Sequence, residues 1–186
     1  MSLTKTMLLN NLIKFSLKKN NKLNIKGLAI NSKQAQKGYI FFAIRGNKIN
    51  GEEYINEAIS RGAVVIICSK NCKFESSKVV VIKTENIRKF LSNIASKFYK
   101  LKPKNIIAVT GTNGKTSVAD YFYQIFNINK IAASSIGTLG IKYNNKIEKN
   151  NLTSPDTITL HKNLEKLKKN NINNVIMEAS SHGLDQ

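Results

Sequence analysis

The order of apolar and polar residues predicts strands and helices that alternate along the first hundred residues. Short apolar runs rich in β-branched or aromatic residues predict strands at 39–44, 63–68 and 79–83. Helical spacing of apolar residues predicts helices at 7–15, 51–62 and 86–101. The last helix carries a single apolar stripe, made of Ile87, Phe90, Leu91, Ile94, Phe98 and Leu101. This alternation indicates a small α/β domain.

A second α/β unit is expected after Pro103, which stands between two lysines and marks the predicted boundary between domains 1–103 and 104–186. Residues 106–109 are apolar throughout, which predicts a buried strand of a parallel sheet. Residues 117–126 are expected to be helical, with an apolar face formed by Val118, Tyr121, Phe122 and Ile125.

Further strands of this second unit are expected at 130–135, 137–143 and 173–178. Between them a helix is expected in 154–170, with Ser154 as its N-cap, Pro155 at its first position, and a stripe of Ile158, Leu160, Leu164 and Leu167. The sequence ends in a loop just after a strand. We therefore expect an N-terminal piece of a longer protein, with a mostly parallel sheet that is incomplete.

Length and composition limit the number of domains and the classes of protein that the chain can belong to. The 186 residues are 41% hydrophobic, enough for one large or two small domains. Neither a membrane-spanning run nor a secretory signal is recognisable, so a cytoplasmic location is expected. Cys68 and Cys72 lack further metal ligands nearby, and Cys68 is expected to be buried as a small apolar residue, without a disulfide.

The net charge of +19 would usually suggest nucleic acid as a partner. Three of the 30 basic residues are arginines, and the lysines are scattered without interleaved aromatic residues. Lysine, asparagine and isoleucine are abundant together, as an AT-rich coding sequence would produce. We therefore expect no nucleic-acid partner and no membrane insertion, although the positive field would favour an anionic substrate.

The segment TGTNGKT, residues 110–116, carries the clearest chemistry. It joins a predicted strand to a predicted helix, and unpaired backbone N–H groups converge at such a turn to bind phosphate. Lys115 adds a mobile cation, and the Thr116 hydroxyl could ligate Mg²⁺. The segment predicts a nucleoside triphosphate site; the alternative is an ordinary glycine-rich turn. The ATP-binding residues would be Thr110, Gly111, Thr112, Asn113, Gly114, Lys115 and Thr116.

Glu178 ends a predicted strand of the same unit, and ligands of open α/β sheets lie beyond the carboxyl ends of the strands. We therefore expect Glu178 near Thr116, where its carboxylate could hold Mg²⁺; the alternative is a solvated glutamate. His182 follows in a polar loop and is by itself a weak ligand candidate. His161 lies among polar helix positions and is expected at the surface.

Four segments together resemble the N-terminal portion of a Mur ligase. They are TGTNGKT (110–116), GTLG (137–140), LTSPDTITLH (152–161) and MEASSHGLDQ (177–186), and residues 30–55 of the first domain resemble the family as well. The phosphate loop is common to all Mur ligases and to folylpolyglutamate synthetases. TSPD followed by MEASSHGLDQ is more specific to the MurE type, the UDP-N-acetylmuramoyl-tripeptide synthetases.

The resemblance implies roles for individual residues. Ile30, Ser32, Asn47, Lys48 and Ile49 would contact the uridine diphosphate end of the substrate. Thr153, Ser154, Ser180 and Gln186 would contact its muramoyl-dipeptide part. Lys115, Glu178 and His182 would be catalytic, and the Mg²⁺ positions would be Thr116, Glu178 and His182.

The implied function is ATP-dependent amide-bond formation in peptidoglycan precursor synthesis. The partners would be UDP-N-acetylmuramoyl-L-alanyl-D-glutamate and a diamino acid, for which we expect meso-2,6-diaminopimelate over L-lysine. The cofactors would be ATP and Mg²⁺. Other candidates are a different Mur ligase, a folylpolyglutamate-synthetase-like ligase, and a phosphate-loop regulatory protein. The predicted UDP-binding domain argues against the folate enzyme, which begins directly at its ATP domain.

Overall fold

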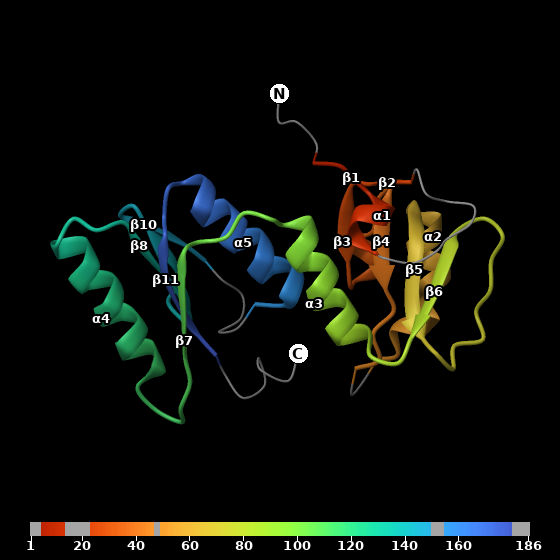
Figure 1. Ribbon diagram of the computed structural model, residues 1–186. Coiled ribbons are helices and arrows are strands. Elements are labelled where there is room, and N and C mark those ends of the chain that lie inside the picture. Colours follow the sequence, from red (N-terminus) through yellow and green to blue (C-terminus); the bar gives the residue numbers. More distant parts are fainter. Residues whose placement is uncertain (1–4, 14–22, 47–48, 150–154, 180–186) are drawn as a thin grey trace. The chain divides into compact units, whose positions relative to one another are not determined.

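The computed structural model describes residues 5–13, 23–46, 49–149 and 155–179. It divides into two compact units, Met1–Phe98 and Tyr99–Gln186, each with its own hydrophobic core (Figure 1). Among the described residues, no helix is long and apolar enough to cross a membrane.

The first unit is built on a four-stranded sheet in the order β3-β4-β5-β6, in which all neighbouring strands are parallel. Its strands are β3 (Gly27–Ala29), β4 (Tyr39–Phe42), β5 (Ala63–Ser69) and β6 (Val80–Thr84). A separate antiparallel pair joins β1 (Met7–Leu8) to β2 (Asn24–Ile25). Residues 7–8, which lie in the predicted helix at 7–15, form strand β1 instead, and strands β2 and β3 were not predicted because they are too short to show a period.

The helical segments of this unit are α1 (Leu9–Leu12), the 3₁₀ turns η1 (Ser32–Gln34) and η2 (Gly51–Tyr54), α2 (Ile55–Ser60) and α3 (Ile87–Phe98). Ile55 and Ala58 of α2 pack on Phe41 and Ile66 of the sheet. The predicted helix at 51–62 is present, but its first four residues form the 3₁₀ turn η2 and the α-helix begins at Ile55. On α3 the predicted stripe is buried at Leu91, Ile94 and Phe98, whereas Leu101 lies beyond the helix and is exposed.

Cys68 and Cys72 are free cysteines in the core of this unit. Cys68 has no exposed surface, which confirms its prediction as a small apolar residue. Burial, followed by the neighbouring Cys72, raises the pKa of the Cys68 thiol to about 12. The thiol is therefore neutral at physiological pH.

The second unit holds a five-stranded sheet in the order β10-β9-β8-β11-β7. Its strands are β7 (Asn105–Val109), β8 (Ala133–Gly137), β9 (Gly140–Tyr143), β10 (Lys146–Glu148) and β11 (Asn174–Glu178). Strands β7, β11 and β8 are parallel, and β9 and β10 extend the sheet in antiparallel fashion. The sequence analysis missed β10, which is short and mostly exposed.

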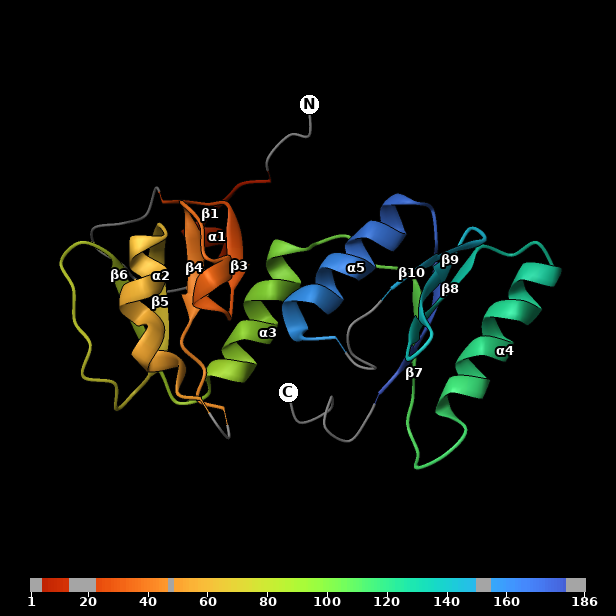
Figure 2. The ribbon, with the colours of Figure 1, turned by 180° about the vertical axis from the view of Figure 1, so that it is seen from behind.

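Two helices cover opposite faces of this sheet, α4 (Lys115–Ile128) on one side and α5 (Thr157–Lys169) on the other (Figures 1 and 2). Leu164 and Leu167 of α5 pack on Ile136, Ile141 and Val175, which form the core of the unit. Ile158 and Leu160, also in the predicted stripe, are partly exposed.

The start of α5 corrects one prediction. Asp156, and not Ser154, is the N-cap: its Oδ1 accepts hydrogen bonds from the backbone N–H of Ile158 at 2.9 Å and of Thr159 at 3.1 Å. Pro155 accordingly precedes the helix. An aspartate cap is worth about 1 kcal/mol and suits the positive end of the helix dipole.

The predicted burial of the strand before the phosphate loop was wrong. Strand β7 pairs only with β11 among the described strands, so its Ile106 and Ile107 are 41% and 45% exposed. On α4, Val118, Tyr121 and Ile125 are 49%, 62% and 57% exposed, and Ala119 is the buried residue of that helix. The apolar residues correctly predicted a strand and a helix, but no described residues cover these exposed side chains.

Candidate functional site

The loop that joins β7 to α4 has the backbone that phosphate binding requires. Gly111 and Gly114 have φ values of +146° and +80°, a region that other residues rarely adopt. Gly114 is the N-cap of α4, and no side chain caps this end of the helix. The helix N-terminus therefore presents its first N–H groups and the positive end of its dipole to the loop.

Lys115 begins α4 and folds back over the loop. Its Nζ donates hydrogen bonds to the carbonyl oxygens of Gly111 and Thr112, the latter at 3.2 Å. Both acceptors are exposed loop carbonyls, which an incoming phosphate can replace as partners of the ammonium group. The exposed loop residues Thr110 and Asn113 lie in the same turn.

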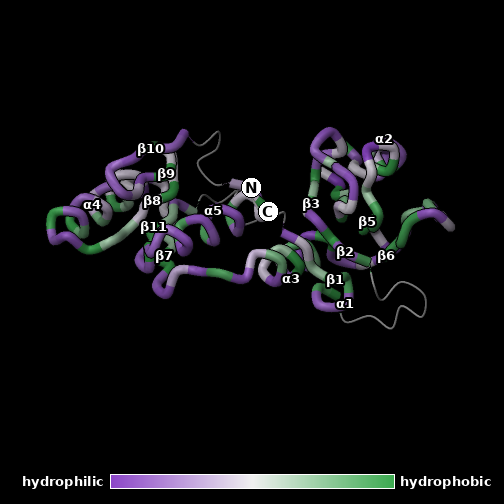
Figure 3. Tube along the Cα trace, turned by 90° about the horizontal axis from the view of Figure 1, so that it is seen from above, coloured by the Kyte–Doolittle hydropathy of each residue, from purple (hydrophilic) through white to green (hydrophobic). Residues whose placement is uncertain are grey.

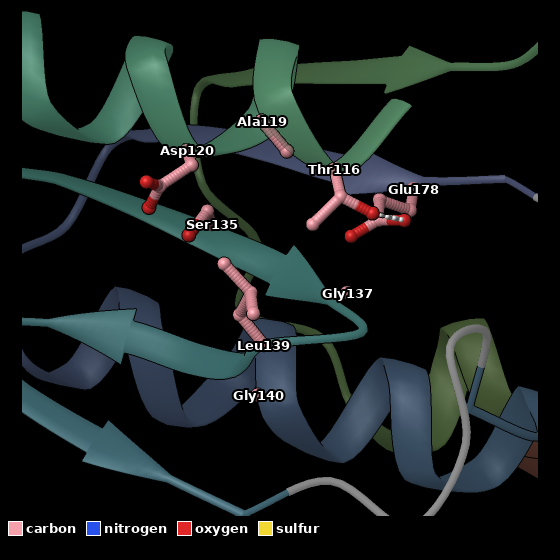
Figure 4. Close-up of a pocket in the computed structure, with 8 residues that line it drawn as sticks. All are labelled: Thr116, Ala119, Asp120, Ser135, Gly137, Leu139, Gly140 and Glu178. Carbon is pink, nitrogen blue, oxygen red and sulfur yellow. Dashed lines mark hydrogen bonds between the residues drawn. The ribbon is translucent and has the colours of Figure 1, made fainter. Parts of the chain in front are cut away.

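Thr116 and Glu178 are brought together, as the sequence analysis expected. The Thr116 hydroxyl donates a 2.9 Å hydrogen bond to Glu178 Oε2 (Figure 4). Glu178 ends β11 and is only 2% exposed, so it is not the solvated glutamate of the alternative interpretation. Its carboxylate oxygens are thus held beside the phosphate loop and away from bulk solvent.

The turn after β8 holds the Glu178 carboxylate from a second side. The backbone N–H of Thr138 donates to Oε1 at 2.9 Å, and the Thr138 hydroxyl donates to Oε2 at 3.2 Å. Gly137 makes this approach possible, because a Cβ there would lie 2.0 Å from Glu178 Oε1. Gly137 and Thr138 were not predicted as site residues, although both belong to the GTLG segment.

A small pocket opens between α4 and the sheet at this carboxylate (Figure 4). It is lined by Thr116, Ala119, Asp120, Ser135, Gly137, Leu139, Gly140 and Glu178. Lys142 of β9 donates a 2.5 Å hydrogen bond to Asp120 Oδ1, and this bond keeps the pKa of the Asp120 carboxyl below its usual value. The sequence analysis did not identify Asp120, which follows Thr116 by one helical turn.

The residues present suit a magnesium–nucleotide complex. Thr116 and Glu178 supply a hydroxyl and a carboxylate, both hard oxygen ligands, beside a loop built for phosphate. No group of three or more His, Cys, Asp or Glu side chains that could hold a metal occurs within the described ranges. Mg²⁺ bound with a nucleotide commonly takes few protein ligands and completes its shell with phosphate and water.

In the first unit, Ser32 is 5% exposed and its hydroxyl donates a 2.6 Å hydrogen bond to Glu57 Oε2. This bond, with a smaller contribution from Arg61, lowers the pKa of Glu57. Ile30 follows β3 directly and is half-buried, and Ile49 is 60% exposed. Of the other predicted site residues, Asn47, Lys48, Thr153, Ser154, Ser180, His182 and Gln186 lie outside the described residues.

His161 is less exposed than its prediction as a surface residue implied. Its ring is partly buried on α5, and Nδ1 has no hydrogen-bond partner among the described residues. Burial, and to a lesser degree the charge of Lys102, lowers its pKa. His161 is therefore neutral at pH 7.

Comparison with known proteins identifies relatives of both units. Residues 24–99 match the model described as "Mur ligase family, catalytic domain", and residues 109–186 match the "Mur ligase middle domain". A UDP-N-acetylmuramoyl-L-alanyl-D-glutamate--2,6-diaminopimelate ligase of Rhizobium meliloti is 40% identical over 164 residues, covering 88% of this chain and 34% of the relative. The enzyme of the same name from Zymomonas mobilis is 41% identical over 162 residues, 87% of this chain and 33% of its own.

Solved structures show the same fold. A structure of a UDP-N-acetylmuramoyl-L-alanyl-D-glutamate--2,6-diaminopimelate ligase superposes with a TM-score of 0.80 at 22% identity, over 97% of this chain and 37% of the other. The MurF ligase of Thermotoga maritima in complex with ADP superposes with a TM-score of 0.56 at 20% identity, over 83% of this chain and 32% of the MurF chain. The chain spans about a third of the length of the relatives it matches. Its two units and their order are those of Mur ligases, and the chain belongs to the Mur ligase family.

Proposed function

We propose that this chain is part of an ATP-dependent acid–amino-acid ligase of peptidoglycan precursor synthesis. The observation that carries the proposal is the contact between Thr116 and Glu178 beside an uncapped helix N-terminus. The names of relatives about 40% identical support the reaction. Because the chain spans only about a third of those relatives, the activity is proposed for the longer protein. A cytoplasmic location would suit an enzyme that uses ATP.

The reaction would join UDP-N-acetylmuramoyl-L-alanyl-D-glutamate to 2,6-diaminopimelate, the substrates in the names of the relatives. The D-glutamate side-chain carboxylate would attack the γ-phosphorus of ATP and release ADP, which gives an acyl phosphate. The amine of the diamino acid would then attack the acyl carbon, form the amide and release inorganic phosphate and a proton. Such a reaction needs neutralisation of phosphate charge more than a protein nucleophile. Mg²⁺ would supply part of that neutralisation when bound.

The residues of the second unit would act on the nucleotide. The N–H groups of the 110–116 loop and Lys115 Nζ would bind the phosphate oxygens, while Thr116 and Glu178 would hold Mg²⁺. His182, Thr153, Ser154, Ser180 and Gln186 stay assigned by family resemblance alone. The first unit would bind the uridine diphosphate end, near Ile30, Ser32, Asn47, Lys48 and Ile49.

The decisive experiment is phosphate release by the full-length protein. The assay contains ATP, Mg²⁺ and UDP-N-acetylmuramoyl-L-alanyl-D-glutamate, with either meso-diaminopimelate or L-lysine. We expect release that depends on meso-diaminopimelate. Phosphate release that requires L-lysine would mean that L-lysine is the amino acid added, and the proposed type of reaction would still hold. Release with neither, by a folded protein that binds ATP, would contradict the proposal and favour another ligase of the superfamily or a regulatory nucleotide-binding protein.

A Lys115→Ala variant of the same full-length protein tests the loop. We expect turnover to be abolished while the far-UV circular dichroism spectrum stays that of the wild type, because the hydrogen bonds of the Lys115 side chain within the described part of the chain go to exposed loop carbonyls. Lys146→Ala, which removes an exposed lysine of β10, is the matched control. Wild-type turnover in Lys115→Ala would contradict the assignment of the nucleotide site.

A further inference from the structure

Helix α4 meets the sheet through polar side chains. Besides the Thr116–Glu178 bond, Lys142 Nζ bonds Asp120 at 2.5 Å, the Tyr123 hydroxyl accepts from the Asn145 backbone N–H at 3.2 Å, and Asn127 Nδ2 donates to Asn145 Oδ1 at 3.2 Å. Ala119 is the one buried residue of the helix. These hydrogen bonds and the ion pair therefore help to fix the position of α4 on the sheet.

The spacing of these residues shows that they form one face of the helix. Thr116, Asp120, Tyr123 and Asn127 follow one another at intervals of four, three and four, so they share a face. The exposed apolar residues occupy the opposite face and are Val118, Tyr121, Ile125 and Ile128. Figure 3 shows the resulting mixture of hydrophilic and hydrophobic colour along α4.

The Asp120–Lys142 pair is the most protected of the ion pairs in the described part of the chain. Its side chains are 16% and 21% exposed, whereas every other pair has at least one partner more than 30% exposed. The second carboxylate oxygen of Asp120 accepts from Gln124 Nε2 at 2.7 Å. Low exposure weakens solvent screening, so this pair contributes more than a surface ion pair does.

The Asp120–Lys142 pair lies at a position where a shift of α4 would change the geometry of the nucleotide site. Asp120 is one turn after Thr116, and both residues line the pocket that reaches Glu178 (Figure 4). Lys142 lies on β9 opposite Ser135 of β8, and β8 continues into the turn where Thr138 holds Glu178. The ion pair thus links the helix that carries Thr116 to the strands that position its partner.

We propose that Asp120 and Lys142 are positioning residues of the nucleotide site: their ion pair holds α4 at the rotation and depth at which the Thr116 hydroxyl meets Glu178. The pair does not touch the nucleotide in this scheme. Its part in the reaction rests on the proposed function, but its effect on the Thr116–Glu178 contact does not.

A double-mutant cycle tests the link without any ligand. Urea unfolding of the 186-residue chain, followed by a probe in the second unit, is measured for Lys142→Met, for Thr116→Val and for the double variant. We expect the two losses of stability to be less than additive, because the first change already weakens the contact that the second removes. Asp120→Asn replaces Lys142→Met if the latter does not fold. Additive losses would overturn the proposal.

Binding of Mg²⁺·ADP, measured by calorimetry on the full-length protein, gives the functional readout. We expect Lys142→Met to weaken binding by about fivefold or more, the range of ordinary coupling between sites, and Lys142→Arg to restore it. Lys166→Met removes an ion pair of the same unit, between α5 and β10, and should bind as the wild type does. Equal weakening in Lys142→Met and Lys166→Met would overturn the positioning role. If the wild type binds no Mg²⁺·ADP, the proposed function fails, and the unfolding cycle alone decides.

Discussion

The hydroxyl of Thr116 and the carboxylate of Glu178 lie 2.9 Å apart although 62 residues separate them in the sequence. Parallel pairing of β11 with β7 accounts for the contact, because Glu178 is level with Val109 at the strand end that leads into the phosphate loop. The sheet therefore places the carboxylate at the start of α4 before any ligand arrives. Such preorganisation lowers the cost of binding a charged ligand.

Glu178→Gln should weaken Mg²⁺-dependent ADP binding by roughly 10- to 100-fold, since interactions of a charged group contribute about 1.5–3 kcal/mol. The change keeps the size of the side chain and removes its charge. Calorimetry with and without Mg²⁺ measures the effect, which should disappear without the metal. Glu148→Gln, a glutamate of the same unit outside the site, is the control. Equal affinity for Mg²⁺·ADP in Glu178→Gln and the wild type would remove Glu178 from the metal site.

Gly137→Ala should lower the free energy of unfolding of the second unit by about 1–3 kcal/mol, the usual cost of overpacking. The new Cβ would meet Glu178 Oε1 at 2.0 Å, and the carboxylate cannot move without losing its bonds to Thr116 and Thr138. Urea unfolding measures the loss. Gly46→Ala is a milder control, since its Cβ would meet its nearest neighbour, Ile49 O, at 3.4 Å. An unchanged stability in Gly137→Ala would mean that Glu178 is not held as described.

Cys68 predicts how the stability of the first unit depends on alkaline pH. Its folded-state pKa of about 12 lies above the ordinary value of 9.0, so its contribution is complete below pH 9 and is lost as pH rises from 9 toward 12. Cys68→Ala should reduce this loss, as measured by urea unfolding at pH 8 and pH 10. An identical pH dependence in the variant and the wild type would contradict the burial of this thiol.

Ile125→Lys should change the free energy of unfolding of the 186-residue chain by no more than about 0.5 kcal/mol, because Ile125 is 57% exposed. It should also reduce self-association, seen by light scattering, since it interrupts the apolar face of α4. Ile136→Ala is the contrast: Ile136 has no exposed surface, and its truncation should cost about 2–5 kcal/mol. A comparable loss in both variants would show that α4 is covered in this chain.

The apolar pattern predicted the type of most helices and strands, because long segments repeat their period several times. It did not predict which face of α4 meets the sheet. Val118, Tyr121 and Ile125 mark an apolar face, but a periodic pattern does not say what covers it, and here polar residues meet the described sheet instead. Short strands such as β2 and β10 have too few residues to show any period.

The pairing of Glu178 with Thr116 could be predicted because the strand ends of a parallel sheet share one edge. The part played by Gly137 and Thr138 could not, since it depends on how closely one turn approaches one carboxylate. The ion pair of Asp120 and the partial burial of His161 likewise depend on packing between elements far apart in the sequence. A residue type alone does not specify such contacts.

The division at Phe98 has a consequence for measurements of cooperativity. Each unit has its own core, Phe41 and Ile66 in the first and Ile136 and Val175 in the second. A chain with two separate cores need not unfold in a single all-or-none transition. One midpoint fitted to a whole-chain melting curve would average two events and describe neither. A separate spectroscopic reporter in each unit is needed before any free energy is assigned to the molecule.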